Sequence, residues 1–178
     1  MAHSSLFTSN TDEWFTPAEL FDELNAEYGP FELDVCATPE NAKCSNFFTK
    51  EQDCLKQDWT VVKKCWMNPP YGHPEKPCKP QCPKQKCKKR GWHVETYIPG
   101  VIDFMRKASE TAKQGTMVVA LVPARTDAKW WHSYVWDRKA RAPYPGVCIN
   151  YLKGRRTFGG AKSSAPFPSV VVIFNPPT

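Results

Sequence analysis

The residue types that could do chemistry stand together in Asn68-Pro69-Pro70-Tyr71, which directly follows the apolar run 65–67. The carbonyl of the Asn68 side chain can accept a hydrogen bond from an exocyclic amino group. Pro69 fixes its own φ and keeps Asn68 out of the helical region, so the chain stays extended and then turns. The Pro69 carbonyl can accept the second amino hydrogen, and Tyr71 offers a flat face on which a base can stack. These parts suit methyl transfer to an amino nitrogen.

A basic insert, residues 73–93, follows this tetrapeptide. It holds seven basic residues against one acid, Glu75, whereas the rest of the chain has 17 basic and 17 acidic residues, so the insert carries the whole net charge of +6. Such a cluster attracts a polyanion, and nucleic acid is the partner that this charge favours. We expect Lys88, Lys89 and Arg90 to contact it. The alternative interpretation is a solvated loop.

The same insert contains candidate metal ligands. Cys78, Cys82, Cys87 and His93 follow the pattern Cys-x3-Cys-x4-Cys-x5-His, which offers three thiolates and one imidazole and suits tetrahedral zinc. The two-residue spacing that is usual between the first two cysteines is absent, and His73 could take the place of His93. A segment rich in proline and lysine has no apolar core of its own, and a metal would supply one. Three free thiols in a flexible loop are the alternative.

Length and composition set limits on the class of protein. The chain has 178 residues, of which 41% are apolar, and this fits a single domain over residues 1–178 that includes the insert. No apolar run approaches the roughly 20 residues that a membrane helix needs. The first ten residues lack the pattern of a signal peptide, so we expect a cytoplasmic location. Eight cysteines in such a chain are more typical of thiols or metal ligands than of disulfides.

Alternating helices and strands should position these groups. Thr16-Pro17 with Glu19 has the form of a capping box that opens a helix, and Asp34 comes near the carboxyl end of an alternating strand. The insert has a proline at every third position from 74 to 83, which disfavours both helix and strand. The pattern indicates an α/β sheet with an antiparallel edge strand near the C-terminus. The expected strands are 31–37, 61–67, 116–123 and 170–174, and the expected helices are 16–28, 101–114 and 124–136.

Taken together, these motifs resemble the small phage-encoded Dam-type DNA N6-adenine methyltransferases over roughly residues 12–175. The resemblance implies a class I (Rossmann-like) methyltransferase fold that uses S-adenosylmethionine and methylates an adenine flipped out of DNA. It also implies a site-specific, adenine-specific enzyme that modifies phage DNA against host restriction, in the bacterial cytoplasm and with no obligate protein partner. The motifs that carry it are 14–17, 33–37, 58–59, 67–71, 121–127 and 154–158.

The resemblance also implies roles for single residues. Thr16 and Pro17 would lie near the methionine end of the cofactor, and Asp34 would receive its ammonium group. Further cofactor contacts fall on Asp53, on Asp58 with Trp59 packed nearby, and on Cys36 and Ala37, which replace the usual glycine-rich turn. Apart from the resemblance, we expect Arg125 and Arg156 to contact DNA.

Ordinary structural roles remain open for several of these residues. Asp34 could cap a turn, Arg125 could pair with Asp127, and Arg156 could lie on a solvated hairpin. The function also has alternatives, namely methylation of RNA adenine or of a protein glutamine, or a zinc-containing nucleic-acid-binding module without catalysis.

Overall fold

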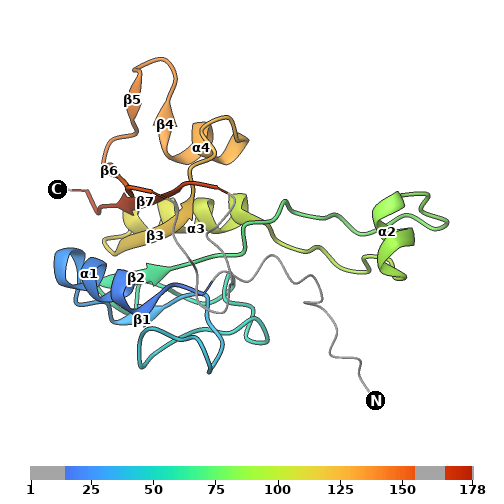
Figure 1. Ribbon diagram of the computed structural model, residues 1–178, viewed down its shortest axis with the longest axis horizontal. Coiled ribbons are helices and arrows are strands. Elements are labelled where there is room, and N and C mark those ends of the chain that lie inside the picture. Colours follow the sequence, from blue (N-terminus) through green and yellow to red (C-terminus); the bar gives the residue numbers. More distant parts are fainter. Residues whose placement is uncertain (1–14, 155–166, 178) are drawn as a thin grey trace.

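The computed structural model describes residues 15–154 and 167–177. Within them the chain forms a five-stranded sheet with helices on both faces, a small two-stranded hairpin and a projecting arm (Figure 1). The mixed α/β class is as predicted. The elements are α1 (Ala18–Tyr28), β1 (Leu33–Asp34), β2 (Lys64–Met67), α2 (Gln85–Arg90), α3 (Val101–Lys113), β3 (Met117–Pro123), α4 (Lys129–Tyr134), β4 (Trp136–Asp137), β5 (Ala142–Pro143), β6 (Val147–Tyr151) and β7 (Ser169–Phe174).

The sheet is mostly parallel, with the strand order β1-β2-β3-β7-β6. β1, β2 and β3 run parallel, while β7 is antiparallel to both of its neighbours, so β7 alone runs against the other four. The predicted antiparallel strand is therefore confirmed, but its predicted place at the edge is wrong. All six residues of β7 are buried, which requires cover on both faces, and the partly exposed β6 takes the edge.

Alternating side chains of the sheet feed two apolar cores. On one face, Trp66 of β2 packs edge-on against Phe21 of α1, with ring centroids 5.4 Å apart, and lies close to Phe31. On the other face, Cys65 and Met67 pack with the residues of α3 and α4. This period of two is the pattern that a strand buried on both sides must show.

Several predicted elements are shorter than expected, among them β2, which begins at Lys64 and not at residue 61. α1 begins after Pro17 without a side-chain cap, so the capping box is not formed, because the Thr16 hydroxyl accepts a hydrogen bond from Asn68 instead. The expected strand at 31–37 is reduced to β1, and the expected helix at 124–136 is reduced to α4. None of the helices in the described part of the chain has the length and apolarity that a bilayer crossing requires.

Residues 73–99, here called the arm, leave the body between the end of β2 and the start of α3 (Figure 1). The two sides of the arm meet at its base, where the amide of Val101 donates to the carbonyl of Gly72 at 3.0 Å. A Cβ on Gly100 would lie 2.3 Å from the backbone nitrogen of Pro74, so this close approach requires glycine. The arm also contains α2, which the sequence did not predict; α2 starts where the regular prolines stop.

Candidate functional site

The predicted catalytic tetrapeptide lies at the carboxyl end of β2. Asn68 is half-buried, and its Nδ2 donates to the Thr16 hydroxyl at 3.1 Å. The Tyr71 hydroxyl donates to Asn68 Oδ1 at 2.7 Å and reaches the carbonyl of Leu121 at 3.4 Å. The bond to Thr16 and the bond from Tyr71 fix the orientation of the Asn68 amide, because its nitrogen can only donate and its oxygen can only accept. Pro69 is buried directly beside it, which leaves the loop little freedom to turn.

Tyr71 itself is packed into the protein. Its side chain is 5% exposed, and its ring meets Phe167 edge-on with centroids 5.6 Å apart. Burial raises the pKa of the Tyr71 phenol well above its usual range, so the hydroxyl keeps its proton. In this conformation the ring presents no open face to a base, and the stacking role stays a prediction. Phe167 and Leu121 are far from Tyr71 in the sequence, so the tetrapeptide alone could not reveal this burial.

Asp34 lies one strand away, at the carboxyl end of β1. β1 is parallel to β2 and Asp34 pairs in register with Trp66. Asp34 and Asn68 therefore lie together at the carboxyl ends of two neighbouring strands. The two carboxylate oxygens of Asp34 accept the amides of Cys36 at 3.2 Å and Lys43 at 3.0 Å. Burial raises the pKa of Asp34 from 3.8 to about 6, although these amides oppose the shift. Asp34 therefore caps the following loop, and its binding of a cofactor remains a prediction.

The other expected cofactor residues are less enclosed. Asp58 is engaged by the hydroxyl and amide of Thr60, which lower the pKa of its carboxyl group. Asp53 is paired with Lys56 at 2.8 Å. Trp59 is fully buried in the core, where its Nε1 donates to a backbone carbonyl, and the packing of its ring on a cofactor stays a prediction.

Cys36 and Ala37 lie in the loop that Asp34 caps. Cys36 is half-buried, and burial raises the pKa of its thiol, with a further contribution from Cys54 beside it. Ala37 is buried, and its amide donates to the carbonyl of Phe48 at 3.0 Å. This stretch therefore lines the edge of the sheet that carries Asn68 and Asp34.

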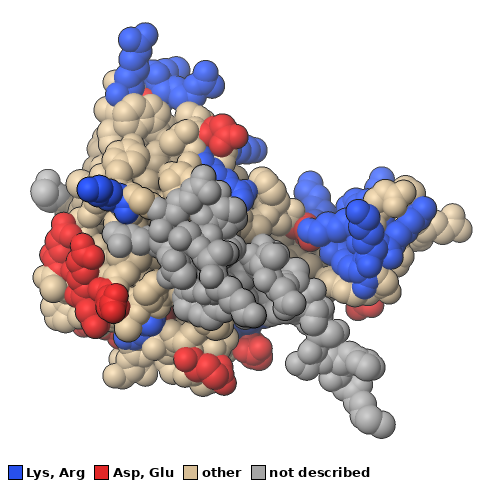
Figure 2. Space-filling model, in the orientation of Figure 1, with Lys and Arg blue, Asp and Glu red and all other residues tan. Residues whose placement is uncertain are grey.

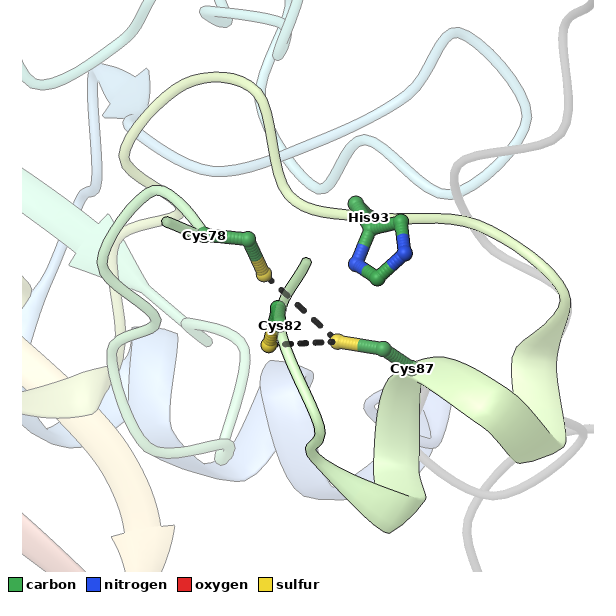
Figure 3. Close-up of side chains that lie close together, drawn as sticks. All are labelled: Cys78, Cys82, Cys87 and His93. Atoms are coloured by element: carbon green, nitrogen blue, oxygen red, sulfur yellow. Dashed lines mark hydrogen bonds between the residues drawn. The ribbon is translucent and has the colours of Figure 1, made fainter. Parts of the chain in front are cut away.

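The four expected metal ligands come together in the arm (Figure 3). The ligand atoms of Cys78, Cys82, Cys87 and His93 all lie within 4.8 Å of one another. The sulfur atoms of Cys78 and Cys87 are 3.5 Å apart, and those of Cys82 and Cys87 are 3.9 Å apart. A hydrogen bond with the backbone of Val94, and smaller ones with His93 and the other thiols, lower the pKa of Cys78 to about 6. Three thiols and one imidazole at these separations could hold a metal ion.

Arg90 is held inside the arm. Its guanidinium donates to Glu75 at 3.0 Å and to the sulfur of Cys87 at 3.3 Å, and it lies 3.9 Å from the ring centroid of Trp92. Only 15% of the side chain is exposed. Of the three expected DNA contacts in the insert, Lys88 and Lys89 are exposed and Arg90 is not. The sequence signal for this difference is Glu75, the single acid of the insert.

Basic residues also gather outside the arm. Arg125 is exposed after β3, and the described residues show no ion pair between it and Asp127. Arg156 lies outside the described residues. A group that sequence reasoning missed lies in the turn of the β4–β5 hairpin, although the run Arg-Lys-Ala-Arg at 138–141 was a visible signal (Figure 2). Its charged members, all exposed, are Arg138, Lys139 and Arg141.

The sequence from residue 3 to residue 176 matches the family model described as DNA N-6-adenine-methyltransferase (Dam). The chain belongs to the Dam family. The resemblance drawn from its motifs is therefore confirmed, and the family name implies DNA as the substrate.

Individual Dam relatives agree with this assignment. A DNA N-6-adenine-methyltransferase of Haemophilus phage HP1 is 29% identical over 184 aligned positions, which cover 99% of this chain and 86% of that protein. A protein of the same name from Escherichia phage T1 is 29% identical over 120 residues, or 67% of this chain but only 39% of the phage protein. The putative methyltransferase YfdM of Escherichia coli K12 is 37% identical over 65 residues, 34% of this chain and 71% of that protein.

Proposed function

We propose that this Dam-family chain transfers a methyl group from S-adenosylmethionine to N6 of an adenine that is flipped out of DNA. The observation that carries the proposal is the fixed amide of Asn68 at the carboxyl end of β2. Ligands of open α/β sheets bind beyond the carboxyl ends of the strands, and Asp34 occupies the same edge. We infer that the fold is the class I methyltransferase fold.

The residues of the loop would act by position and charge. Asn68 Oδ1 and the Pro69 carbonyl would accept the two hydrogens of the adenine amino group, which favours a pyramidal N6 whose lone pair faces the methyl group. No covalent bond to the protein is needed, because the acceptors are already in place before reaction.

Asp34 suits the cofactor's ammonium group. Its buried carboxylate uses one acceptor position on each oxygen for the backbone, and each oxygen has another. A cationic ligand beside it would favour the charged form of Asp34 and so oppose the effect of burial. When bound, S-adenosylmethionine supplies the electrophilic methyl group. We assign Thr16, Pro17 and the loop at 36–37 to the walls of the same site.

We also propose that the Cys3His cluster of the arm binds one zinc ion. All four ligand atoms lie close enough together for tetrahedral coordination, and two of the thiols are buried. Arg90 would donate to a zinc-bound thiolate and balance part of its charge. Metal analysis of the purified chain should find one zinc per molecule, and a Cys87→Ser variant should retain much less.

The test of the reaction is transfer of tritiated methyl groups to unmethylated duplex DNA. Wild type should form N6-methyladenine, and Asn68→Ala should lose at least about a hundred-fold in rate, the range seen when a preorganised polar group is removed. Asn175→Ala is the matched control and should keep its activity, since Asn175 follows the antiparallel strand β7 and lies at the amino ends of the parallel strands, away from Asn68. Label that appears only in RNA or protein, or an Asn68→Ala variant as active as wild type, would contradict the proposal.

A further inference from the structure

The arm has almost no core of its own. Of residues 73–99, only Cys82, Cys87 and Val94 are buried, and two of these three are members of the Cys3His cluster. Fixing the backbone of a residue costs about 1–2 kcal/mol, which so little apolar burial cannot offset. A metal ion held by four ligands can supply the missing free energy. The shape of the arm therefore depends on its metal.

The surface of the arm is strongly basic. Six lysines are exposed on it, and within the described residues only Lys86 is paired with an acid, Glu75. Counting Arg90 and the two acids of the arm, the net charge is seven minus two, or +5. Figure 2 shows Lys and Arg side chains gathered on the arm. The exposed lysines are Lys76, Lys79, Lys84, Lys86, Lys88 and Lys89.

The arm leaves the body immediately after the catalytic loop. Tyr71 is followed by Gly72, which forms the base of the arm with Val101. A polyanion that is bound at the catalytic loop and extends past it, as duplex DNA does, can therefore reach the exposed lysines.

From these observations we propose that the metal-loaded arm is a second DNA-contact surface. It binds the phosphate backbone of the DNA at a distance from the flipped adenine. The inference rests on the proposed DNA substrate and on the proposed zinc site. Zinc with three thiolates carries a charge of −1, so loading the metal adds no positive charge to the arm. Tighter DNA binding after loading must then come from the ordering of the lysines and not from added charge.

The experiment is DNA binding by fluorescence anisotropy, with the full chain and a fluorescent duplex between 50 and 200 mM salt. Each phosphate contact adds about 0.9 to the slope of log affinity against log salt, so Lys88→Gln/Lys89→Gln should flatten the slope by about 1.8. The ratio of the DNA affinity of wild type to that of this variant should be roughly twelve-fold larger at 50 mM than at 200 mM salt. Lys63→Gln/Lys113→Gln is the matched control, because both lysines are exposed at the opposite end of the sheet. Its slope should equal that of wild type.

The dependence on metal is tested with Cys87→Ser and with chelated wild type, with zinc measured in every sample. Both should lose zinc and show the flattened slope, whereas Lys88→Gln/Lys89→Gln should keep its zinc. If the lysine variant has the same slope of log affinity against log salt as wild type, the proposal that the arm contacts DNA is overturned. Unchanged binding after proven loss of zinc, or a wild-type chain without zinc, overturns the metal dependence.

Methyl transfer by the same samples separates this inference from the proposed function. At saturating DNA the lysine variant should keep the wild-type kcat and show a higher KM for DNA. A wild-type chain that binds DNA with the expected slope but transfers no methyl group would contradict the proposed reaction alone.

Discussion

Thr16→Val should lower the rate of methyl transfer without weakening cofactor binding. The two side chains have nearly the same shape, so the change removes the hydroxyl that accepts Asn68 Nδ2 at 3.1 Å and leaves packing intact. Thr16 is only 4% exposed, so water cannot easily replace the lost acceptor. The amide of Asn68 would then lose this acceptor for its Nδ2, while Tyr71 still donates to its Oδ1.

The size of the effect follows from the hydrogen bond. A neutral hydrogen bond contributes about 0.5–1.5 kcal/mol net, and 1.36 kcal/mol changes a rate tenfold. If the bond acts only by orienting Asn68 for the transition state, kcat should fall by roughly two- to thirteen-fold. Thr16→Ser keeps the hydroxyl and should stay close to wild type.

The assay is steady-state methyl transfer with S-adenosylmethionine varied at saturating DNA. Orientation of Asn68 predicts a lower kcat with an unchanged KM for S-adenosylmethionine, whereas direct cofactor binding by Thr16 predicts a higher KM. An unchanged kcat in Thr16→Val, or an equal loss in Thr16→Ser, would refute the positioning role.

Three further predictions concern stability. Gly100→Ala should lower the melting temperature and detach the base of the arm, because the new Cβ lies 2.3 Å from backbone, whereas Gly72→Ala meets nothing within 4 Å and should melt like wild type. Trp66→Ala should cost about 3–5 kcal/mol in denaturant unfolding, while Val61→Ala, with Val61 67% exposed, should change little. The folded chain holds the proton of Asp34 more tightly than the unfolded one, since its pKa is raised from 3.8 to about 6. The unfolding free energy should therefore fall by about 2 kcal/mol as pH rises from 4 to 6, and a trend equally steep in Asp34→Asn would rule this cause out.

Local patterns predicted the parts of the molecule whose contacts are local. The apolar run before Asn68 became β2, the helical stripe after residue 100 became α3, and the spacing of the cysteines brought four ligands together. Each depends on neighbours within a few residues, which the sequence displays directly. The Dam family itself could be predicted for the same reason, since its motifs are short and ordered.

The parts that could not be predicted depend on distant partners. Thr16 was expected to cap a helix, but Asn68, 52 residues away, takes its hydroxyl. β7 was expected at the edge, but β6 pairs with it and leaves it inside the sheet. In each case the competing partner is fixed only once the chain is folded.

The pinched base of the arm has a consequence for how the chain can change over time. Gly72 and Val101 are joined by a backbone hydrogen bond of 3.0 Å, so the two ends of a 27-residue excursion, residues 73–99, lie side by side. A segment whose ends already meet can be lengthened, shortened or exchanged at a small cost in loop-closure entropy and without moving β2 or α3. Insertion or loss of the whole excursion is therefore a short evolutionary step, which would alter how the protein grips its substrate while the catalytic loop stays in place.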